Sequence, residues 1–412
     1  MKRRIAASAA VILAALGLAA ACTTFAPTGG FTPRLTYQRL AVVDPSNLTE
    51  AQRDLLGSRA NLNIYRTLAH HPDLYNRWSP LGQFLLNGSS ISPRHREIAM
   101  LRMGWLCQSP YEWSQHARIA KASAGMTDAE VHRIAEGADA AGWSDMDRAV
   151  IRMADDLRYD AMISDATWAD LRKGYSDNQV MELLFTSAQY QLVSMALNTL
   201  GIQVEPEAVD FIPKDVPLPR TATRPAASRL TTPRIAPIAV TALSPQQRAL
   251  VAGQIRPDGS LPNLYGTMIN HPTLYVPRVR FGSYLQRDSM LDAQTRELLI
   301  MRTAWNIRAE YEWAHHVEAA KTAGFTDTQI ARIAQGPGAS GWTEKQRALL
   351  SAADELRREA FVSDETWNTL ARYYPMKERI EIVYTVGGYT MTGLAINSFG
   401  IQVEPGYPEM PR

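Results

Sequence analysis

A six-residue helical motif occurs twice in this chain, and this repeat constrains the fold more than any other feature. Residues 111–116 read Tyr-Glu-Trp-Ser-Gln-His, and residues 311–316 read Tyr-Glu-Trp-Ala-His-His. The copies stay in register around the motif and end in nearly the same sequence, at residues 198–206 and 397–405. The chain therefore forms one fold twice, and each copy serves as an internal comparison for the other.

The length and the repeat together predict two domains. A chain of 412 residues exceeds the size that one hydrophobic core usually organises, whereas each copy is long enough to bury a core of its own. We predict a signal peptide at 1–22, a tether at 23–47, a first domain at 48–206, a Pro-, Thr- and Arg-rich linker at 207–242, a second domain at 243–406 and a tail at 407–412.

Helix start signals indicate an all-α fold of two tandem helical-bundle domains. A Ser or Thr is followed three residues later by Glu or Gln at 127/130, 176/179, 326/329 and 343/346, which is the pattern of a capping box. Ser92 and Ser109 each precede a proline and are predicted to cap helices. No run alternates with period two, so each copy should form six or seven helices.

The last long helix of the second copy carries Gly387, Gly388 and Gly393, where the first copy has larger residues. Glycine weakens a helix but lets another helix approach closely. We therefore predict tight helix packing at these positions, between the domains or between subunits.

The N-terminus resembles an export signal, with a basic start at residues 2–4, an apolar stretch at 5–18 and small residues before Cys22. This predicts an exported protein: either a lipoprotein on the periplasmic face of a bacterial membrane, with Cys22 lipidated, or a soluble periplasmic or secreted protein cleaved by ordinary signal peptidase. The other cysteine, Cys107, is replaced by Ile307 in the second copy, which favours a buried apolar role.

The charge balance excludes one class of partner. There are 43 basic and 41 acidic residues, a net charge of +2, and no long run of either sign. A nucleic-acid-binding protein normally carries a basic patch or stripe. We therefore predict no nucleic-acid partner.

The repeated motif supplies a candidate acid–base pair in each copy. Glu112 and His116, like Glu312 and His316, are four residues apart and share one face of a helix. A carboxylate can orient an imidazole and favour its charged form, so the pair can exchange a proton near neutral pH. The alternative is that each pair is an ordinary ion pair on a helix, with no catalytic role.

Several neighbours recur in both copies and could complete a site. An arginine fork matches the geometry of a carboxylate, and aromatic rings can form pocket walls or core. The candidates for substrate binding are Arg102, Arg302, Trp105, Trp305, Tyr111, Tyr311, Trp113 and Trp313. Arg96-Glu97 is interpreted as an ion-pair strut and His71-Pro72 as a helix entry. Two ligands on one helix face are too few for a tight metal site, so no metal is predicted.

These residues resemble a known family. The order Arg96-Glu97, then Glu112-x-x-x-His116, then Ala-Gly-Met-Thr-Asp-Ala-Glu at 124–130 is similar to the carboxymuconolactone decarboxylase family, which includes the alkyl hydroperoxidase D-like proteins. The hydroperoxidase branch uses a Cys-x-x-Cys pair, but the corresponding positions hold Ser109 and Glu112 here, and Ala309 and Glu312 in the second copy. A dithiol reaction needs two thiols, so thiol peroxidase activity is not expected.

The decarboxylase branch implies roles for the remaining residues. By that resemblance the histidines move the proton, the glutamates of the motif orient them, and Arg102 and Arg302 hold a carboxylate. The expected function is cysteine-independent decarboxylation or proton transfer on a small lactone, keto acid or related carbonyl compound, without a cofactor. The alternatives are a non-catalytic small-molecule binding protein, and a redox enzyme that uses Cys107. The resemblance also implies a homo-oligomer, for example a trimer of two-domain chains.

Overall fold

The computed structural model describes residues 31, 33–205, 212–226 and 228–411. The predicted signal peptide at 1–22, with Cys22, and residues 23–30 and 32 of the predicted tether lie outside these residues. Within them every regular element is helical, which confirms the all-α prediction. None of the described helices is both long and apolar enough to span a bilayer.

Each repeat forms nine α-helices among the described residues, rather than six or seven. The first repeat contains α1(Glu50–Leu56), α2(Asn63–Leu68), α3(Pro72–Gln83), α4(Pro93–Leu106), α5(Pro110–Ala124), α6(Asp128–Glu136), α7(Asp145–Tyr159), α8(Asp165–Arg172) and α9(Asp177–Leu200). The second contains α10(Pro245–Val251), α11(Asn263–Met268), α12(Pro272–Ser283), α13(Ala293–Ile307), α14(Glu310–Thr322), α15(Asp327–Gln335), α16(Glu344–Glu359), α17(Asp364–Ala371) and α18(Met376–Phe399). The short helices α1, α2, α10 and α11 account for most of the excess.

The predicted helix starts are confirmed with one exception. All four capping boxes are formed, at the starts of α6, α9, α15 and α16. Ser92 caps α4 by accepting a hydrogen bond from the His95 amide. Ser109 makes no capping bond with its side chain, so that prediction is wrong. Its hydroxyl is buried in the turn between α4 and α5, away from the free amides of α5.

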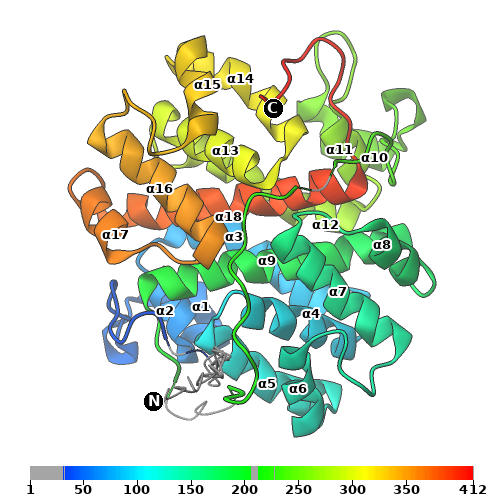
Figure 1. Ribbon diagram of the computed structural model, residues 1–412, viewed down its shortest axis with the longest axis vertical. Helices are drawn as coiled ribbons and strands as arrows, with labels where there is room; N and C mark the ends of the chain where they lie inside the picture. The colour runs from blue at the N-terminus through cyan, green and yellow to red at the C-terminus, as the bar shows by residue number, and fades with distance from the viewer. Residues whose placement is uncertain (1–30, 32, 206–211, 227, 412) are drawn as a thin grey trace, which may run out of the picture.

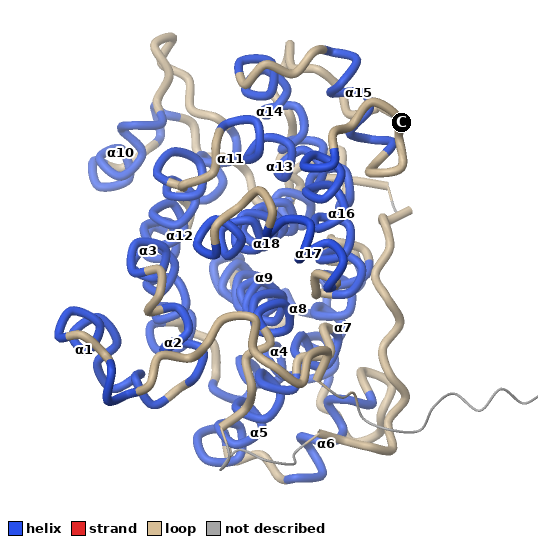
Figure 2. The backbone as a smooth tube through the Cα atoms, turned by 90° about the vertical axis from the view of Figure 1, so that its left-hand side faces the viewer, coloured by secondary structure: helices blue, strands red, loops and turns tan. Residues whose placement is uncertain are grey.

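The two long helices α9 and α18 lie side by side through the middle of the molecule, and the other helices surround them (Figures 1 and 2). In α9 every residue from Val180 onward is buried, and in α18 every residue from Ile380 onward except Thr392. A helix buried on all faces belongs to a core. A Cβ atom at Gly387 would lie 2.6 Å from Leu192 Cγ of α9, so this close approach joins the two repeats. Cβ atoms at Gly388 and Gly393 would instead lie 2.4 Å from Leu285 and Ile307 of the same repeat.

Two histidine–glutamate pairs cross between the repeats in reciprocal fashion. His71 Nε2 lies 3.0 Å from Glu381 Oε1 of α18, and His271 Nε2 lies 2.7 Å from Glu182 Oε1 of α9. All four side chains are buried. The histidines stand at the starts of α3 and α12, as the helix-entry interpretation predicted, and each helix start is bonded to the other repeat.

Asparagine and arginine side chains make further reciprocal hydrogen bonds between the two repeats. Asn198 Nδ2 donates to the carbonyl of Ala360, and Asn397 Nδ2 to that of Ala161. Both alanines have positive φ, 51° and 52°, a conformation that costs a non-glycine residue about 1 kcal/mol. Arg158 and Arg357 donate to each other's main-chain carbonyl at 2.6 Å. The repeats therefore meet as the two halves of an isologous dimer do.

Part of the predicted linker belongs to the repeat. Arg39, before α1, donates to Asp364 in α17 at 2.6 Å, and Arg234, in the linker, reaches Asp165 in α8 in the same way. The sequence carries this signal, because Arg-Leu-Thr at 34–36 recurs at 229–231. In each repeat, the segment before the first helix thus contacts the opposite repeat.

We expect Glu381→Ala to lower the free energy of unfolding by about 3–5 kcal/mol, because it leaves His71 and the Met290 amide without their buried acceptor. Urea unfolding followed by circular dichroism measures the change. Glu365→Ala, at an exposed position in α17, is the control and should cost less than about 1 kcal/mol. Because the carboxylate joins the repeats, one cooperative transition should persist; two separate transitions in the wild type would contradict this account.

Candidate functional site

Each repeat buries a histidine–glutamate pair between its fourth and fifth helices, α4 and α5 in the first repeat and α13 and α14 in the second. His116 Nδ1 of α5 lies 2.7 Å from Glu97 Oε2 of α4, and His316 Nδ1 of α14 lies 2.7 Å from Glu297 Oε2 of α13. The carboxylate accepts the Nδ1 proton and fixes the ring, which leaves Nε2 of the neutral imidazole free to take up a proton.

The orienting carboxylate is therefore Glu97 or Glu297, rather than the motif glutamate that the sequence indicated. Glu112 Oε1 lies 3.7 Å from His116 Nε2, which is too far for a hydrogen bond. The Arg96–Glu97 contact that we interpreted as a strut is also long, at 3.9 Å. The Arg-Glu dipeptide does recur in both copies, and this recurrence was the signal for a site role.

The motif glutamates are unusual acids because they are buried. Burial raises the pKa of Glu112 to about 7, although the nearby His116 acts in the opposite direction. Burial raises the pKa of Glu312 well above its usual range, and neither of its carboxyl oxygens has a hydrogen-bond partner among the described residues. Burial thus favours the protonated form of Glu312, which can act as a proton donor in the same cavity as His316.

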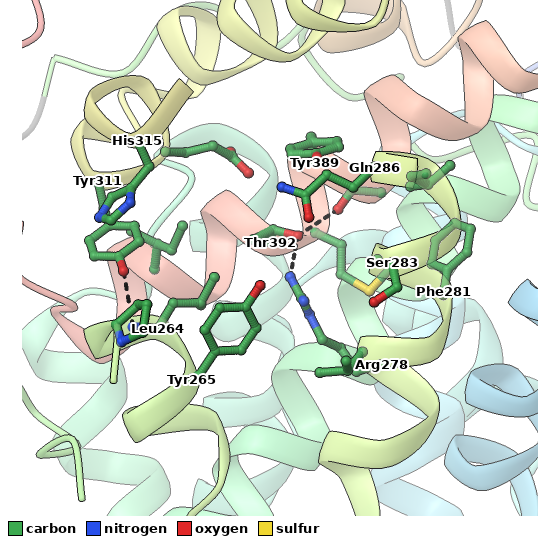
Figure 3. A pocket seen from close by; sticks show the side chains of 18 of the residues that line it. Leu264, Tyr265, Arg278, Phe281, Ser283, Gln286, Tyr311, His315, Tyr389 and Thr392 are labelled. Carbon is green, nitrogen blue, oxygen red and sulfur yellow. Dashed lines mark hydrogen bonds between the residues drawn. The ribbon is translucent and has the colours of Figure 1, made fainter. Parts of the chain in front are cut away.

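In the second repeat Glu312 and His316 line a cavity of about 130 Å³. Figure 3 shows side chains that surround this cavity. A cavity of about 150 Å³ in another protein is known to hold benzene, so this one is suited to a small organic molecule. The side chains that carry polar or reactive atoms into it come from α11, α12, α14, α18 and the π-helix Tyr284–Asp288: Tyr265, Arg278, Ser283, Gln286, Tyr311, Glu312, His315, His316, Tyr389 and Thr392.

Arg278 is the cation of this cavity. Its side chain, on α12, is 9% exposed and donates one hydrogen bond, to Thr392 Oγ1 at 2.6 Å. It forms no ion pair with any residue that the structure describes. Gly282 makes room for it, since a Cβ atom there would lie 3.0 Å from the Arg278 guanidinium.

The same region of the first repeat is filled by bulky side chains. Trp78 stands at the position of Arg278, Gln189 at that of Gly388 and Val193 at that of Thr392. All three are buried, and the Gln189 amide lies over Gly82, the counterpart of Gly282. The two repeats therefore share the histidine–glutamate pair but differ in the space beside it.

The predicted arginines have other partners. Arg102 Nε donates to Asp155 at 2.8 Å, and its terminal nitrogen donates to two carbonyls at the end of α6. Arg302 makes the same contacts with Asp354 and the end of α15. Neither arginine lines the cavity, so the predicted substrate carboxylate has no place on them.

The predicted tryptophans form core rather than cavity wall. Trp105 packs against Trp113 with ring centres 5.3 Å apart, and Trp305 packs against Trp313 at 6.0 Å. These rings pair in the same way in both repeats, and the tryptophans of the second repeat do not line its cavity. Burial also raises the pKa of the Cys107 thiol, which keeps it unreactive.

The predicted tyrosines donate a hydrogen bond to a glutamate in the segment that ends each repeat. Tyr111 donates to Glu205 at 2.7 Å and Tyr311 to Glu404 at 3.2 Å. Burial opposes ionisation of Glu404, but bonds from His315 and from main-chain amides hold its pKa at about 2. His315 is stacked between Tyr311 and Tyr407, with ring centres 4.2 Å away on each side. Only Tyr311 of these predicted aromatic residues reaches the cavity of the second repeat.

Comparison with known proteins identifies the family. The model of the carboxymuconolactone decarboxylase family matches residues 72–156 and 272–355, which run from α3 into α7 and from α12 into α16. Both repeats belong to the carboxymuconolactone decarboxylase family. The first range contains Glu97, Glu112 and His116, and the second contains Arg278, Glu297, Glu312 and His316. No match was found among curated proteins.

Solved structures with low identity to this family member were also found. One is described as the alkylhydroperoxidase AhpD core from Ralstonia eutropha JMP134, with 20% identity over 44% of this chain and 97% of that chain, and a TM-score of 0.38. A putative antioxidant defence protein AhpD from Agrobacterium tumefaciens has 18% identity over 33% and 93%, with a TM-score of 0.31. The debrominase Bmp8 in complex with 2,3,4-tribromopyrrole has 18% identity over 43% and 95%, with a TM-score of 0.34.

Among the described residues, no three His, Cys, Asp or Glu side chains gather as metal ligands would. The absence of a metal or cofactor from the reaction stays a prediction.

We expect Glu112→Gln to stabilise the protein more at pH 8 than at pH 5. A carboxyl whose folded pKa is raised to about 7 keeps its full stability below the unfolded value near 4.5 and loses it as pH rises toward 7. The glutamine carries no such penalty. Urea unfolding should show the variant-minus-wild-type difference growing by on the order of 2 to 3 kcal/mol between the two pH values. A difference that stays constant would mean that Glu112 is not held protonated.

Proposed function

We propose that the cavity of the second repeat is a cysteine-independent acid–base site, which moves a proton on a small lactone, keto acid or related carbonyl compound. The observation that carries the proposal is the meeting of His316, oriented by Glu297, with the unpartnered acid Glu312 in one small cavity. A proton acceptor and a proton donor then face the same ligand. The proposed reaction class is decarboxylation, or isomerisation through an enolate.

The chemistry follows from these two groups. In isomerisation, His316 Nε2 takes a proton from the carbon next to a carbonyl, and the Glu312 carboxyl donates a hydrogen bond to the carbonyl oxygen as it becomes an enolate. The protonated His316 then returns the proton to a different carbon of the conjugated enolate, which gives the isomer and restores the neutral imidazole. In decarboxylation the carbon–carboxylate bond breaks, carbon dioxide leaves, and its electron pair forms the same enolate. Protonated His316 then delivers a proton to the carbon, and solvent restores the histidine.

The absence of a thiol pair supports this class over peroxidase chemistry. Ser109 and Glu112, and Ala309 and Glu312, occupy the positions of the two cysteines in the hydroperoxidase branch. Cys107 is fully buried at the end of α4. We expect Cys107→Ala to keep at least half of the wild-type rate in the assay below, because the thiol does not reach the cavity. Loss of activity in a variant that remains folded would favour the redox alternative.

The proposal also includes the cellular setting predicted from the N-terminus. The protein would be exported, anchored through Cys22 or released by ordinary signal cleavage. Assembly of several two-repeat chains into a homo-oligomer is part of the same proposal, and sedimentation of the mature chain tests it.

The test of function compares two matched variants. His316→Asn should lower the rate at least about 100-fold, as expected for loss of a general acid–base group. His116→Asn removes the equivalent bond in the filled first repeat and should change the rate less than about twofold. The assay screens small keto acids and lactones by NMR, following deuterium exchange at carbon, together with carbon dioxide release.

The two variants separate the possible outcomes. Equal loss in both would assign the effect to folding or to two active repeats, and a full rate in His316→Asn would refute the proposed site. If no compound reacts, but some raise the melting temperature of the wild type and not of His316→Asn, the protein is a binding protein.

A further inference from the structure

Arg278 is a largely buried cation that forms no ion pair with any residue that the structure describes. A guanidinium in a protein interior is stabilised by an anion or by several hydrogen bonds. Its one hydrogen bond to a described residue goes to Thr392, and its other N–H donors are not sealed in the packed interior, so they are accessible to a ligand. Figure 3 shows the side chains of Tyr265 and Arg278 both pointing toward Thr392, across the space of the cavity.

The first repeat shows that the fold does not require this arginine. Trp78 stands at the same position of α3, and its ring packs edge-on against Tyr384 at 5.6 Å. The surrounding helices nevertheless form in the same order with nearly the same lengths. Arg278 is therefore placed for something that the second repeat binds rather than for packing.

The cavity also has the neighbours that an anion site needs. Thr392 is the one residue between Ile380 and Phe399 of α18 that is not buried. Its hydroxyl accepts the bond from Arg278 and donates to the Gly388 carbonyl at 2.9 Å, which fixes the guanidinium in the cavity. Gly388 lines the cavity as well, but a Cβ atom there would lie 2.4 Å from Leu285 Cδ1, so that space is already occupied. A carboxylate fits a guanidinium fork with two parallel hydrogen bonds.

We propose that Arg278, held in place by its bond to Thr392, forms a carboxylate-binding subsite, which holds a carboxylate that the ligand keeps through the reaction. The reaction itself rests on the function proposed above. An ion pair with Arg278 stabilises a carboxylate in the ground state and is lost when that group leaves as carbon dioxide, so it would slow rather than assist its loss. The group that reacts must lie on the side of His316 and Glu312.

The subsite narrows the class of substrate. A proton-transfer substrate carries one carboxylate for Arg278 and a separate carbonyl group for Glu312. A decarboxylation substrate carries two carboxylates, of which one remains. Binding of a carboxylate would also raise the pKa of Glu312 further. Burial raises this pKa and the charge of Arg278 opposes the rise, so a bound carboxylate that neutralises Arg278 would favour the protonated form of Glu312.

The test measures binding separately from turnover. The probes are levulinate, a small keto acid, and levulinamide, its neutral amide, titrated by calorimetry into the wild type, Arg278→Met and Arg278→Lys. We expect levulinate to bind the wild type at least tenfold more tightly than levulinamide. Arg278→Met should remove that preference, and Arg278→Lys should recover part of it, since lysine keeps the charge but not the fork. Trp78→Phe, at the matching position of the first repeat, should leave both affinities unchanged.

Each result decides one question. Equal affinity of the wild type for the two probes, an unchanged preference in a folded Arg278→Met variant, or failure of the wild type to bind levulinate or any other acid of a panel of three- to six-carbon keto and dicarboxylic acids would overturn the subsite. Deuterium exchange into levulinate tests the proposed function independently. Tight binding without exchange leaves the subsite standing and removes the catalytic proposal, whereas exchange on neutral ketones alone does the reverse.

Discussion

The packing of α9 against α18 is the constraint on which the other features depend. Both helices are buried on nearly every face, so neither repeat can close its own core without the other. The contact is tight because Gly387 lets Leu192 approach the helix backbone. Once the two helices are joined, Glu182 and Glu381 reach the histidines at the starts of α12 and α3. Those two helices carry Arg278 and Trp78, the residues in which the two sites differ.

Duplication has left two copies of one acid–base pair in two different surroundings. The bonds of His116 to Glu97 and of His316 to Glu297 have the same length. The first repeat buries Trp78 and Gln189 at the positions where the second has Arg278 and Gly388, and in the second repeat Arg278, Thr392 and His316 line one cavity. The pair is thus part of the common fold, and the side chains around it decide whether a ligand can reach it.

Sequence reasoning found what one helix or one repeat can reveal. Helical spacing placed Glu312 and His316 on one face, and capping boxes located four helix starts correctly. It missed Glu297 as the partner of His316, because that residue lies on another helix and packing between helices is not visible in spacing. Arg302 was assigned to substrate because its true partner, Asp354, lies 52 residues further along the chain. Arg278 carries no signal from the repeat, because the repeat marks residues that are present in both copies and the first copy has Trp78 at this position.

The exchanged histidine–glutamate pairs change how the history of such a chain should be traced. His71 is bonded to the second copy and His271 to the first, so the residues that must change together lie in different repeats. An alignment that treats the repeats as independent sequences would pair His71 with Glu182 and would find no coupling between them. Correlated change should instead connect positions 310 and 89 residues apart within one chain.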